Sequence, residues 1–184
     1  ARSQITIIGG GLAGCEAAWQ IARAGLACVV YEMRPVRTTP AHQTDRLAEL
    51  VCSNSLKSEQ EYSAPWLLKQ ELRRLGSLLL QAADIARVPG GQALTVDREV
   101  FSEHVTQMIE SRPEIEVRRE ELAVVPADGI VIVSTGPLTS DALAAGIARR
   151  TGAEHLYFYD AISPIVEADS VDLSIAFRAS RYGK

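Results

Sequence analysis

The sequence has few cysteines, few aromatic residues and no long hydrophobic run. Its three cysteines, Cys15, Cys28 and Cys52, form no C-x-x-C pair, so neither a zinc knuckle nor a disulfide framework is indicated. Aromatic residues make up only 5% of the chain, and no apolar run approaches the ~18 residues of a membrane span. The first residues also lack the apolar core of a signal peptide. We therefore expect a cytoplasmic protein with no membrane partner and no metal site.

The composition is that of a globular protein with an uneven distribution of charge. The chain has 184 residues, 47% of them hydrophobic and 23% charged, which suits one α/β domain with a sizeable core. A net charge of -4 argues mildly against a nucleic-acid partner. Residues 34–74, however, contain seven basic and five acidic side chains. A polyanion could contact this basic stretch, or the stretch could be a solvated face.

The first thirty residues predict a β-strand, a helix and a second β-strand. A β-branched run at residues 4–8 leads into a glycine-rich turn, as a buried parallel strand does. Small and aliphatic residues then continue from Ala13 to Ala24, and Gly25 ends the helix. A second strand follows over residues 26–31, with Glu32 at its end.

This unit carries the fingerprint of a dinucleotide-binding site. The glycines of G-x-G-x-x-G permit a tight turn, approach of the backbone to a pyrophosphate, and close helix packing. Glu32 follows the last glycine by 18 positions, where a carboxylate can bind the ribose hydroxyls. An acid there disfavours a 2′-phosphate, so we expect FAD or NAD. A second approach of the backbone to the cofactor is expected at Thr135 and Gly136. The residues predicted to bind the cofactor are Gly9, Gly10, Gly11, Leu12, Ala13, Gly14, Glu32, Thr135 and Gly136.

The rest of the chain predicts a long loop, three helices and two strands. We expect a loop over residues 33–65 around an apolar stretch at 47–51, then one helix to about Arg87. The leucines of that helix, spaced as a core-facing stripe, are Leu68, Leu72, Leu75 and Leu79. A helix over residues 98–112, capped by Asp97, precedes a half-exposed strand at 115–119 and a buried strand at 129–134. Ser140 caps the third helix. The last region, residues 156–184, predicts no clear closing element.

The three cysteines have different predicted roles. Cys52 lies in a polar loop, where a cysteine beside a flavin can act as a nucleophile or as an acid or base. Chemistry alone leaves its role open between function and a plain loop position. Cys15 and Cys28 lie in the first helix and the second strand, so we expect them to be small core residues. His104, beside Phe101 and Val105, is expected to pack rather than to bind a ligand.

Several sequence blocks together resemble one known family. They match the folate- and FAD-dependent tRNA (uracil-5-)-methyltransferases, the TrmFO family, over essentially the whole chain. The loop Leu-Val-Cys-Ser-Asn-Ser is far more specific than the glycine fingerprint, which the sister family of wobble-uridine-modifying flavoproteins shares. The blocks are Gly9–Trp19, Tyr31–Pro35, Thr39–His42, Glu49–Leu56, Gly91–Arg98, Thr135–Ser140 and Tyr157–Ile165.

The resemblance implies a reaction, its cofactors and a catalytic residue. Methylenetetrahydrofolate would donate a one-carbon unit, FAD would relay and reduce it with NAD(P)H as reductant, and the acceptor would be carbon 5 of the T-loop uridine in tRNA. A flavin is required because a methylene unit must gain electrons to become a methyl group, and no side chain supplies them. Cys52 matches the first of two family cysteines and is implied to be catalytic, with its detailed role left open. The second lies beyond Lys184.

The resemblance also sets the expected fold and leaves rival interpretations. We expect an α/β, Rossmann-like FAD-binding domain of the two-dinucleotide-binding flavoprotein type. Inserted helices, over residues 65–126, form a possible smaller lobe. Since family members are more than twice as long, the chain resembles an N-terminal part of such an enzyme. Arg178 and Arg181 are candidates for contact with tRNA phosphates. The rivals are the sister wobble-uridine enzyme, a non-catalytic FAD- or tRNA-binding module, and a plain NAD oxidoreductase.

Overall fold

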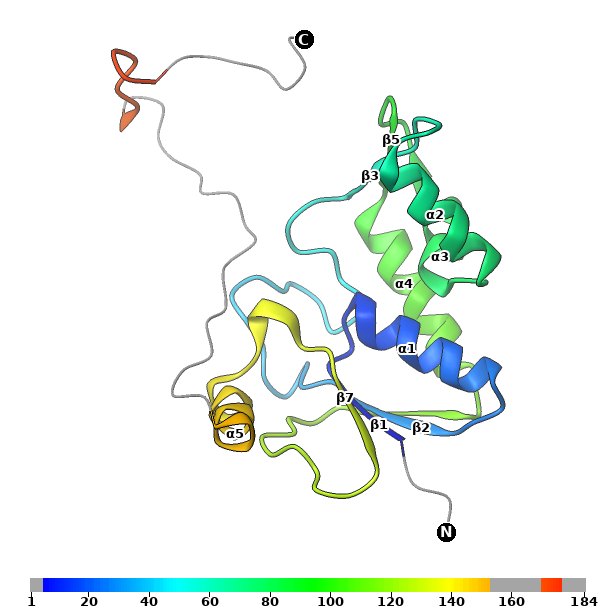
Figure 1. Cartoon of the computed structure of the whole chain (residues 1–184), viewed down its shortest axis with the longest axis vertical. Coiled ribbons are helices and arrows are strands. Elements are labelled where there is room, and N and C mark those ends of the chain that lie inside the picture. The colour runs from blue at the N-terminus through cyan, green and yellow to red at the C-terminus, as the bar shows by residue number, and fades with distance from the viewer. Residues whose placement is uncertain (1–4, 153–169, 177–184) are drawn as a thin grey trace.

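A four-stranded parallel sheet forms the base of the molecule (Figure 1). The computed structural model describes residues 5–152 and 170–176. The strands lie in the order β6-β2-β1-β7, which is the 3-2-1-4 arrangement of doubly wound folds. In register, Ile5 of β1 faces Cys28 of β2 on one side and Ile130 of β7 on the other. The strands are β1 (Ile5–Ile8), β2 (Cys28–Tyr31), β6 (Ile115–Arg118) and β7 (Ile130–Val133).

Two helices cover one face of this sheet and form the core with it. Helix α1 (Leu12–Arg23) packs on β1 and β2, and α4 (Arg98–Glu110) packs on α1 and β6. Cys15 and Cys28 are buried in this core, as predicted. Asp97 caps α4 by accepting hydrogen bonds from the backbone N–H groups of Glu99 (2.9 Å) and Val100 (3.0 Å), which also confirms the prediction.

Helix α5 (Asp141–Thr151) lies apart from α1 and α4, beside the loop that follows β6 (Figure 1). A Cβ at Gly146 of α5 would lie 2.9 Å from the carbonyl oxygen of Ala123, so the helix and this loop are in close contact. Ser140 caps α5 as predicted, by accepting a hydrogen bond from the N–H of Leu143 (3.3 Å). A short 3₁₀ helix, η1 (Gly136–Leu138), connects β7 to α5.

A small antiparallel sheet with two helices forms a second region, which we call the small lobe (Figure 1). Its strands, in the order β3-β5-β4, are β3 (Ser55–Ser58), β4 (Arg87–Val88) and β5 (Ala93–Val96). Its helices are α2 (Ala64–Arg74) and α3 (Leu78–Ile85). Strand β3 was not predicted, because its sequence, Ser-Leu-Lys-Ser, has no β-branched residue. The apolar stretch in the preceding loop is buried at Leu47, Ala48 and Leu50.

The prediction of one continuous helix over residues 65–87 is wrong. The chain turns at Gly76, whose φ of +69° is in the left-handed region that favours glycine. Ser77 then begins α3 by accepting a hydrogen bond from the N–H of Leu80 (3.4 Å). Helix α1 fixes the turn, because the indole Nε1 of Trp19 donates to the carbonyl oxygen of Gly76 (3.1 Å) and Ser77 Oγ donates to Glu16 (2.7 Å).

The break between α2 and α3 changes which of the four leucines pack against the core. Leu72 and Leu79 lie against the core, whereas Leu68 and Leu75 are 55% and 63% exposed. The predicted core-facing stripe is therefore only half correct: within α2 Leu72 packs and Leu68 does not, and the turn at Gly76 separates the exposed Leu75 from Leu79 of α3.

The prediction that β7 is buried is also wrong. Ile130 and Val133 are 56% and 41% exposed. β7 is last in the sheet order, and within residues 5–152 and 170–176 it pairs with β1 alone. A continuous β-branched run does not distinguish a central strand from an edge strand of the same sheet. Among the described residues, no helix is long and apolar enough to cross a membrane.

Candidate functional site

A pocket opens at the carboxyl ends of β1, β2 and β7. Parallel α/β sheets bind ligands at this edge. We call it the cofactor pocket. Of the residues predicted to bind a cofactor, Gly9, Gly10, Gly11, Glu32 and Thr135 line it, whereas Leu12, Ala13, Gly14 and Gly136 lie beside it in the chain. Its other walls come from the segments Tyr31–Arg34, Glu120–Leu122 and Leu138–Ser140 and from His42.

The glycine-rich turn is shaped by close approaches of the backbone. Gly9 has a φ of +106°, and a Cβ there would lie 2.9 Å from the carbonyl atoms of Ser134. A Cβ at Gly14 would lie 1.9 Å from the carbonyl oxygen of Gly9. At Gly11, by contrast, a Cβ would meet nothing within 4 Å. Gly9 and Gly14 thus permit the turn itself, and Gly11 leaves open space at the pocket.

Helix α1 begins at this open space. Its N-cap is Gly11, which has no side chain to accept hydrogen bonds from the first turn, and the first turn has no acidic residue. The first N–H groups of a helix have no partner within it, and the helix dipole favours an anion beside them. The start of α1, at Leu12 and Ala13, therefore suits the binding of a pyrophosphate.

The peptide of Gly10 is held on both sides. Its N–H donates to Oε2 of Glu32 (3.0 Å), and its carbonyl oxygen accepts from the N–H of Ala48 (2.9 Å) and the thiol of Cys15 (3.3 Å). Burial, followed by the nearby charge of Glu32, raises the pKa of Cys15 to about 12. The thiol is therefore a neutral donor that supports the turn.

Glu32 lines the pocket with its carboxylate buried against Arg34. The residue is 5% exposed, and its Oε1 accepts from the backbone N–H and the Nε of Arg34, each at 3.0 Å. Burial opposes ionisation, but the hydrogen bonds and charge of Arg34 and the N–H of Gly10 outweigh it and lower the pKa of Glu32. Glu32 is thus a carboxylate at neutral pH and can accept hydrogen bonds from a diol.

Arg34 also reaches a second carboxylate. Its Nη1 donates to Oε2 of Glu49 (2.9 Å) and to the carbonyl oxygen of Thr44 (3.2 Å). The sequence analysis missed Arg34 and Glu49 as site residues. The only signal for Arg34 was its place in the Tyr31–Pro35 block, and nothing in the sequence indicated a partner 15 positions away.

Ser134 joins β7 to the glycine-rich turn. Its Oγ donates to the carbonyl oxygens of Ile8 (3.0 Å) and Gly9 (3.1 Å). The next residue, Thr135, lines the pocket. The end of β7 thus lies against Gly9, which places the second predicted backbone segment beside the first.

His42 is a further wall residue that sequence reasoning did not select. Its Nδ1 lies 2.7 Å from Oγ1 of Thr39. Burial and then the charge of Arg34 lower the pKa of His42, against the opposing charges of Glu49 and Glu32. The imidazole is therefore neutral at pH 7.

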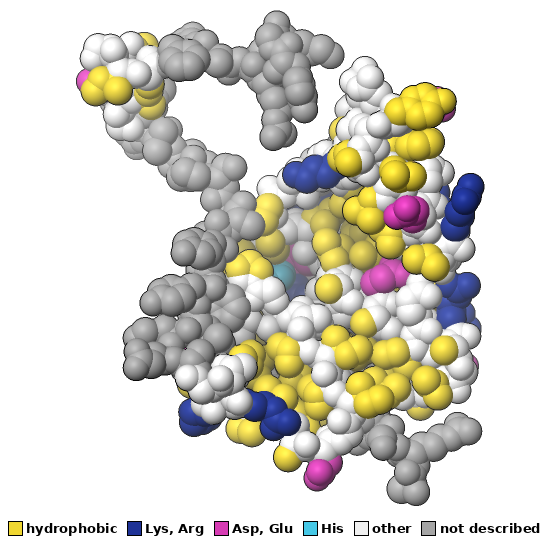
Figure 2. Space-filling model, viewed as in Figure 1, with side chains coloured by type: hydrophobic (Ala, Val, Ile, Leu, Met, Phe, Trp, Pro, Cys, Tyr) yellow, Lys and Arg dark blue, Asp and Glu magenta, His cyan; other side chains and the backbone are white. Residues whose placement is uncertain are grey.

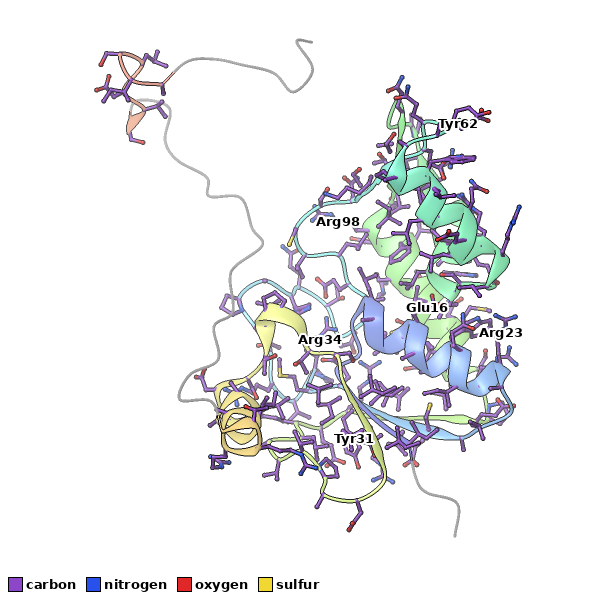
Figure 3. The ribbon with its side chains drawn as sticks, viewed as in Figure 1. Glu16, Arg23, Tyr31, Arg34, Tyr62 and Arg98 are labelled. Atoms are coloured by element: carbon purple, nitrogen blue, oxygen red, sulfur yellow. The ribbon has the colours of Figure 1, made fainter. Side chains whose placement is uncertain are left out.

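Cys52 is the exposed cysteine of the three and does not line the cofactor pocket. It follows the buried Leu50 and precedes β3. Its carbonyl oxygen lies 3.5 Å from Nη2 of Arg98, the first residue of α4, and Figure 3 shows the Arg98 side chain pointing toward this loop. The structure therefore brings the predicted cofactor-binding residues together and leaves Cys52 on a neighbouring loop.

Other predicted features are outside this pocket. Arg178, Arg181 and the Tyr157–Ile165 block lie outside the described residues. His104 is half-buried on α4. Within residues 5–152 and 170–176, no cluster of histidine, cysteine, aspartate or glutamate could hold a metal ion.

Comparison with known proteins connects this geometry to a family. Residues 4–184 match the family described as "Glucose inhibited division protein A". The chain is 69% identical over 180 residues to the methylenetetrahydrofolate–tRNA-(uracil-5-)-methyltransferase TrmFO of Solibacter usitatus, covering 98% of this chain and 40% of that protein. It is 55% identical over 183 residues to the protein of that name from Aquifex aeolicus, covering 100% and 41%. These identities confirm the resemblance drawn from the sequence blocks, and the chain spans about two fifths of the length of these relatives.

A solved structure supports the fold alone. The structure of Aquifex aeolicus GidA aligns with a TM-score of 0.57 at 19% identity, over 74% of this chain and 25% of that one. The predicted α/β, Rossmann-like fold is confirmed by this likeness and by the parallel sheet with its helices.

Proposed function

Because this chain belongs to the glucose inhibited division protein A family, we propose that it is the N-terminal, FAD-binding part of a folate- and FAD-dependent tRNA (uracil-5-)-methyltransferase. The observation that carries the proposal is the cofactor pocket, where the glycine-rich turn, the start of α1 and a buried carboxylate converge. The identity of 69% to an enzyme named for this activity supports the choice of reaction.

The pocket residues suit the adenosine diphosphate half of FAD. The open space at Gly11 and the uncapped first turn of α1 would take the pyrophosphate, with Leu12 and Ala13 supplying N–H donors. Glu32 would accept hydrogen bonds from the ribose hydroxyls. Thr135 and Gly136 would approach the cofactor from β7. Gly10 would hold Glu32 in place through its own N–H.

In the proposed reaction, bound FAD supplies the electrons that convert a methylene unit into a methyl group, with NAD(P)H as the reductant and methylenetetrahydrofolate as the donor. The residues of this chain bind and orient. Cys52 acts in catalysis from the loop next to α4, where its exposed thiol can reach a substrate that the buried thiols of Cys15 and Cys28 cannot. The acceptor is carbon 5 of the T-loop uridine of tRNA.

A transfer experiment tests this function. The complete protein that contains this chain is incubated with unmodified tRNA, FAD, a reductant and methylenetetrahydrofolate labelled in its one-carbon unit. We expect label in 5-methyluridine of the T-loop. Label in the wobble uridine instead would favour the sister activity, and bound FAD with no label anywhere would favour a non-catalytic binding module.

Binding of tRNA provides a second test that does not need turnover. If basic side chains, Arg178 and Arg181 among them, contact phosphates, the logarithm of the association constant falls linearly as the logarithm of salt concentration rises. Replacing both arginines by glutamine should make that slope shallower. A salt response equal to that of wild type would remove both residues from the tRNA surface.

A further inference from the structure

A buried arginine connects the cofactor pocket to the loop that carries Cys52. The Arg34 side chain is 2% exposed and lies between two carboxylates, with its Nε 3.0 Å from Oε1 of Glu32 and its Nη1 2.9 Å from Oε2 of Glu49. A guanidinium is planar and presents its donors in a fixed fork. Its orientation toward one carboxylate therefore fixes its orientation toward the other.

Each end of this ion-pair cluster continues into backbone contacts. At one end, Oε2 of Glu32 accepts from the N–H of Gly10 (3.0 Å), and both residues line the cofactor pocket. At the other end, Glu49 accepts from the N–H groups of Gln43 (2.8 Å) and Thr44 (3.1 Å). A chain of charge-assisted hydrogen bonds therefore runs from the glycine-rich turn to the loop that precedes Cys52.

Glu49 is the member of the cluster that lies nearest to Cys52 in the sequence. It lies three residues before Cys52 and does not line the cofactor pocket. Its side chain is 11% exposed, so its charge is also shielded from water. Its side-chain contact with a residue that lines the pocket is the one with Arg34.

We propose that Arg34 is a positioning residue that couples FAD binding at Glu32 to the placement of residues 43–52, the loop that carries Cys52. The inference rests on the proposed function, because it takes FAD as the ligand at Glu32. Coupling between two sites is reciprocal. FAD in the pocket therefore favours the loop placement that Arg34 supports, and a loop that has lost Glu49 binds FAD more weakly.

The first experiment is a double-mutant cycle on FAD affinity. The dissociation constant is measured by titration of the complete apoprotein for wild type, Arg34→Met, Glu49→Ala and the double variant. We expect each single change to raise the constant about tenfold or more, as loss of a charge-assisted hydrogen bond does. We expect the dissociation constant of the double variant to equal that of Arg34→Met, because Arg34→Met already removes the contact with Glu49. Arg34→Lys should recover part of the affinity.

The matched control is Arg46→Met. Arg46 belongs to the same loop, but it is 33% exposed and its ion pair with Glu103 is long, at 3.8 Å. We expect its FAD affinity to equal that of wild type.

The second experiment measures how accessible the loop is, through the reactivity of Cys52. The rate at which Cys52 reacts with a thiol reagent is measured without FAD and with saturating FAD, and the labelled residue is located by peptide mapping. Cys15 and Cys28 are buried and serve as internal references. In wild type we expect FAD to slow the reaction at Cys52, and in Arg34→Met we expect most of that FAD dependence to disappear even at saturation.

The outcomes separate this inference from the proposed function. If wild type binds no FAD, the proposed function fails and the inference fails with it. If wild type binds FAD and folded Arg34→Met binds it equally well, only the inference is overturned. Additive effects in the cycle would also overturn it, because they would mean that Glu49 acts independently of Arg34. Should Arg34→Met fail to fold, an unchanged FAD affinity in Glu49→Ala overturns the inference.

Discussion

The cofactor end of the sheet and the small lobe are built by different means. Around the glycine-rich turn, backbone approaches backbone, and the buried polar groups of Gly10 and Glu32 have short hydrogen bonds. The small lobe joins the rest of the molecule through side chains: Glu16 and Trp19 of α1 bond to the turn before α3, and the buried leucines and alanines of α3 share one core with α1 and α4. It exposes leucines of α2 and Tyr62, which is 90% exposed. Figure 2 shows hydrophobic side chains gathered on the surface over this lobe.

The difference indicates where substitutions are tolerated. A site formed by close backbone approach cannot accept an added methyl group without moving the chain. In the small lobe, by contrast, a substitution removes the contacts of one side chain and leaves the others in place. The predictions below test this comparison, beginning with the largest expected effect.

Cys52→Ala should have the largest effect on activity and almost none on folding. We expect methyl transfer by the complete protein to fall on the order of 10²–10⁴-fold, as loss of a catalytic acid, base or nucleophile does. Stability should change by less than about 0.5 kcal/mol, because the side chain is exposed. Initial rates and thermal unfolding measure the two quantities.

The control for Cys52 is Cys28→Ala, which removes a thiol from the core. It should lower stability and leave the rate per folded molecule unchanged. Full activity in Cys52→Ala would remove Cys52 from the mechanism.

Gly14→Ala and Gly11→Ala should separate the two uses of glycine in one turn. A Cβ at residue 14 would lie 1.9 Å from the carbonyl oxygen of Gly9, so we expect a loss of about 2–4 kcal/mol in the free energy of unfolding. A Cβ at residue 11 meets open space, so that variant should fold normally and bind FAD more weakly. Denaturant unfolding and FAD titration distinguish them, and equal stabilities would show that the close approach at Gly14 relaxes easily.

Glu32→Ala should weaken retention of FAD about 10- to 100-fold, because the ribose hydroxyls lose a charged acceptor. Flavin content after dialysis measures this, and unchanged content would remove the ribose role of Glu32.

The pH dependence of stability tests the pairing of Glu32 in wild type. Folding lowers the pKa of Glu32, so its ionised form stabilises the native state at neutral pH, and that stabilisation is lost as the pH falls below 4.5, the ordinary value for glutamate. In Glu32→Gln the free energy of unfolding should change less between pH 7 and pH 4 than in wild type. Parallel pH profiles would contradict the ionised pairing with Arg34.

Leu68→Ala and Leu72→Ala should give the smallest effects and test the small lobe. Leu68 is 55% exposed, whereas Leu72 packs against the core. We expect Leu68→Ala to change the free energy of unfolding by less than about 0.5 kcal/mol and Leu72→Ala to lower it by about 1–3 kcal/mol. Chemical denaturation of wild type and both variants under the same conditions measures these differences. A large loss in Leu68→Ala would mean that α2 is covered in the complete protein.

Much of the cofactor end could be predicted because its constraints are local. The G-x-G-x-x-G turn, the strand before it and the helix after it follow from short-range limits on backbone angles and space. The caps of α4 and α5 at Asp97 and Ser140 are local for the same reason, since a cap bonds to N–H groups two or three residues away.

The parts that were mispredicted or missed depend on distant partners. Leucine spacing over residues 68–79 suits one helix, but α1 holds a turn at Gly76 through Trp19. The run at 130–133 is apolar in either a central or an edge strand, and only the sheet order shows that β7 has one partner in the described part of the chain.

The sequence by itself determined the order of the βαβ unit, the glycine turn and the acid at the end of β2, since each is set within a few residues by backbone geometry. The tertiary structure alone decided that Arg34 faces Glu49 as well as Glu32 and that Cys52 stands on a loop beside α4. The contacts of Arg34 with Glu49 and of Arg98 with Cys52 join residues 15 and 46 positions apart, and a buried guanidinium can pair with a carboxylate so placed only after the fold has brought the two within reach.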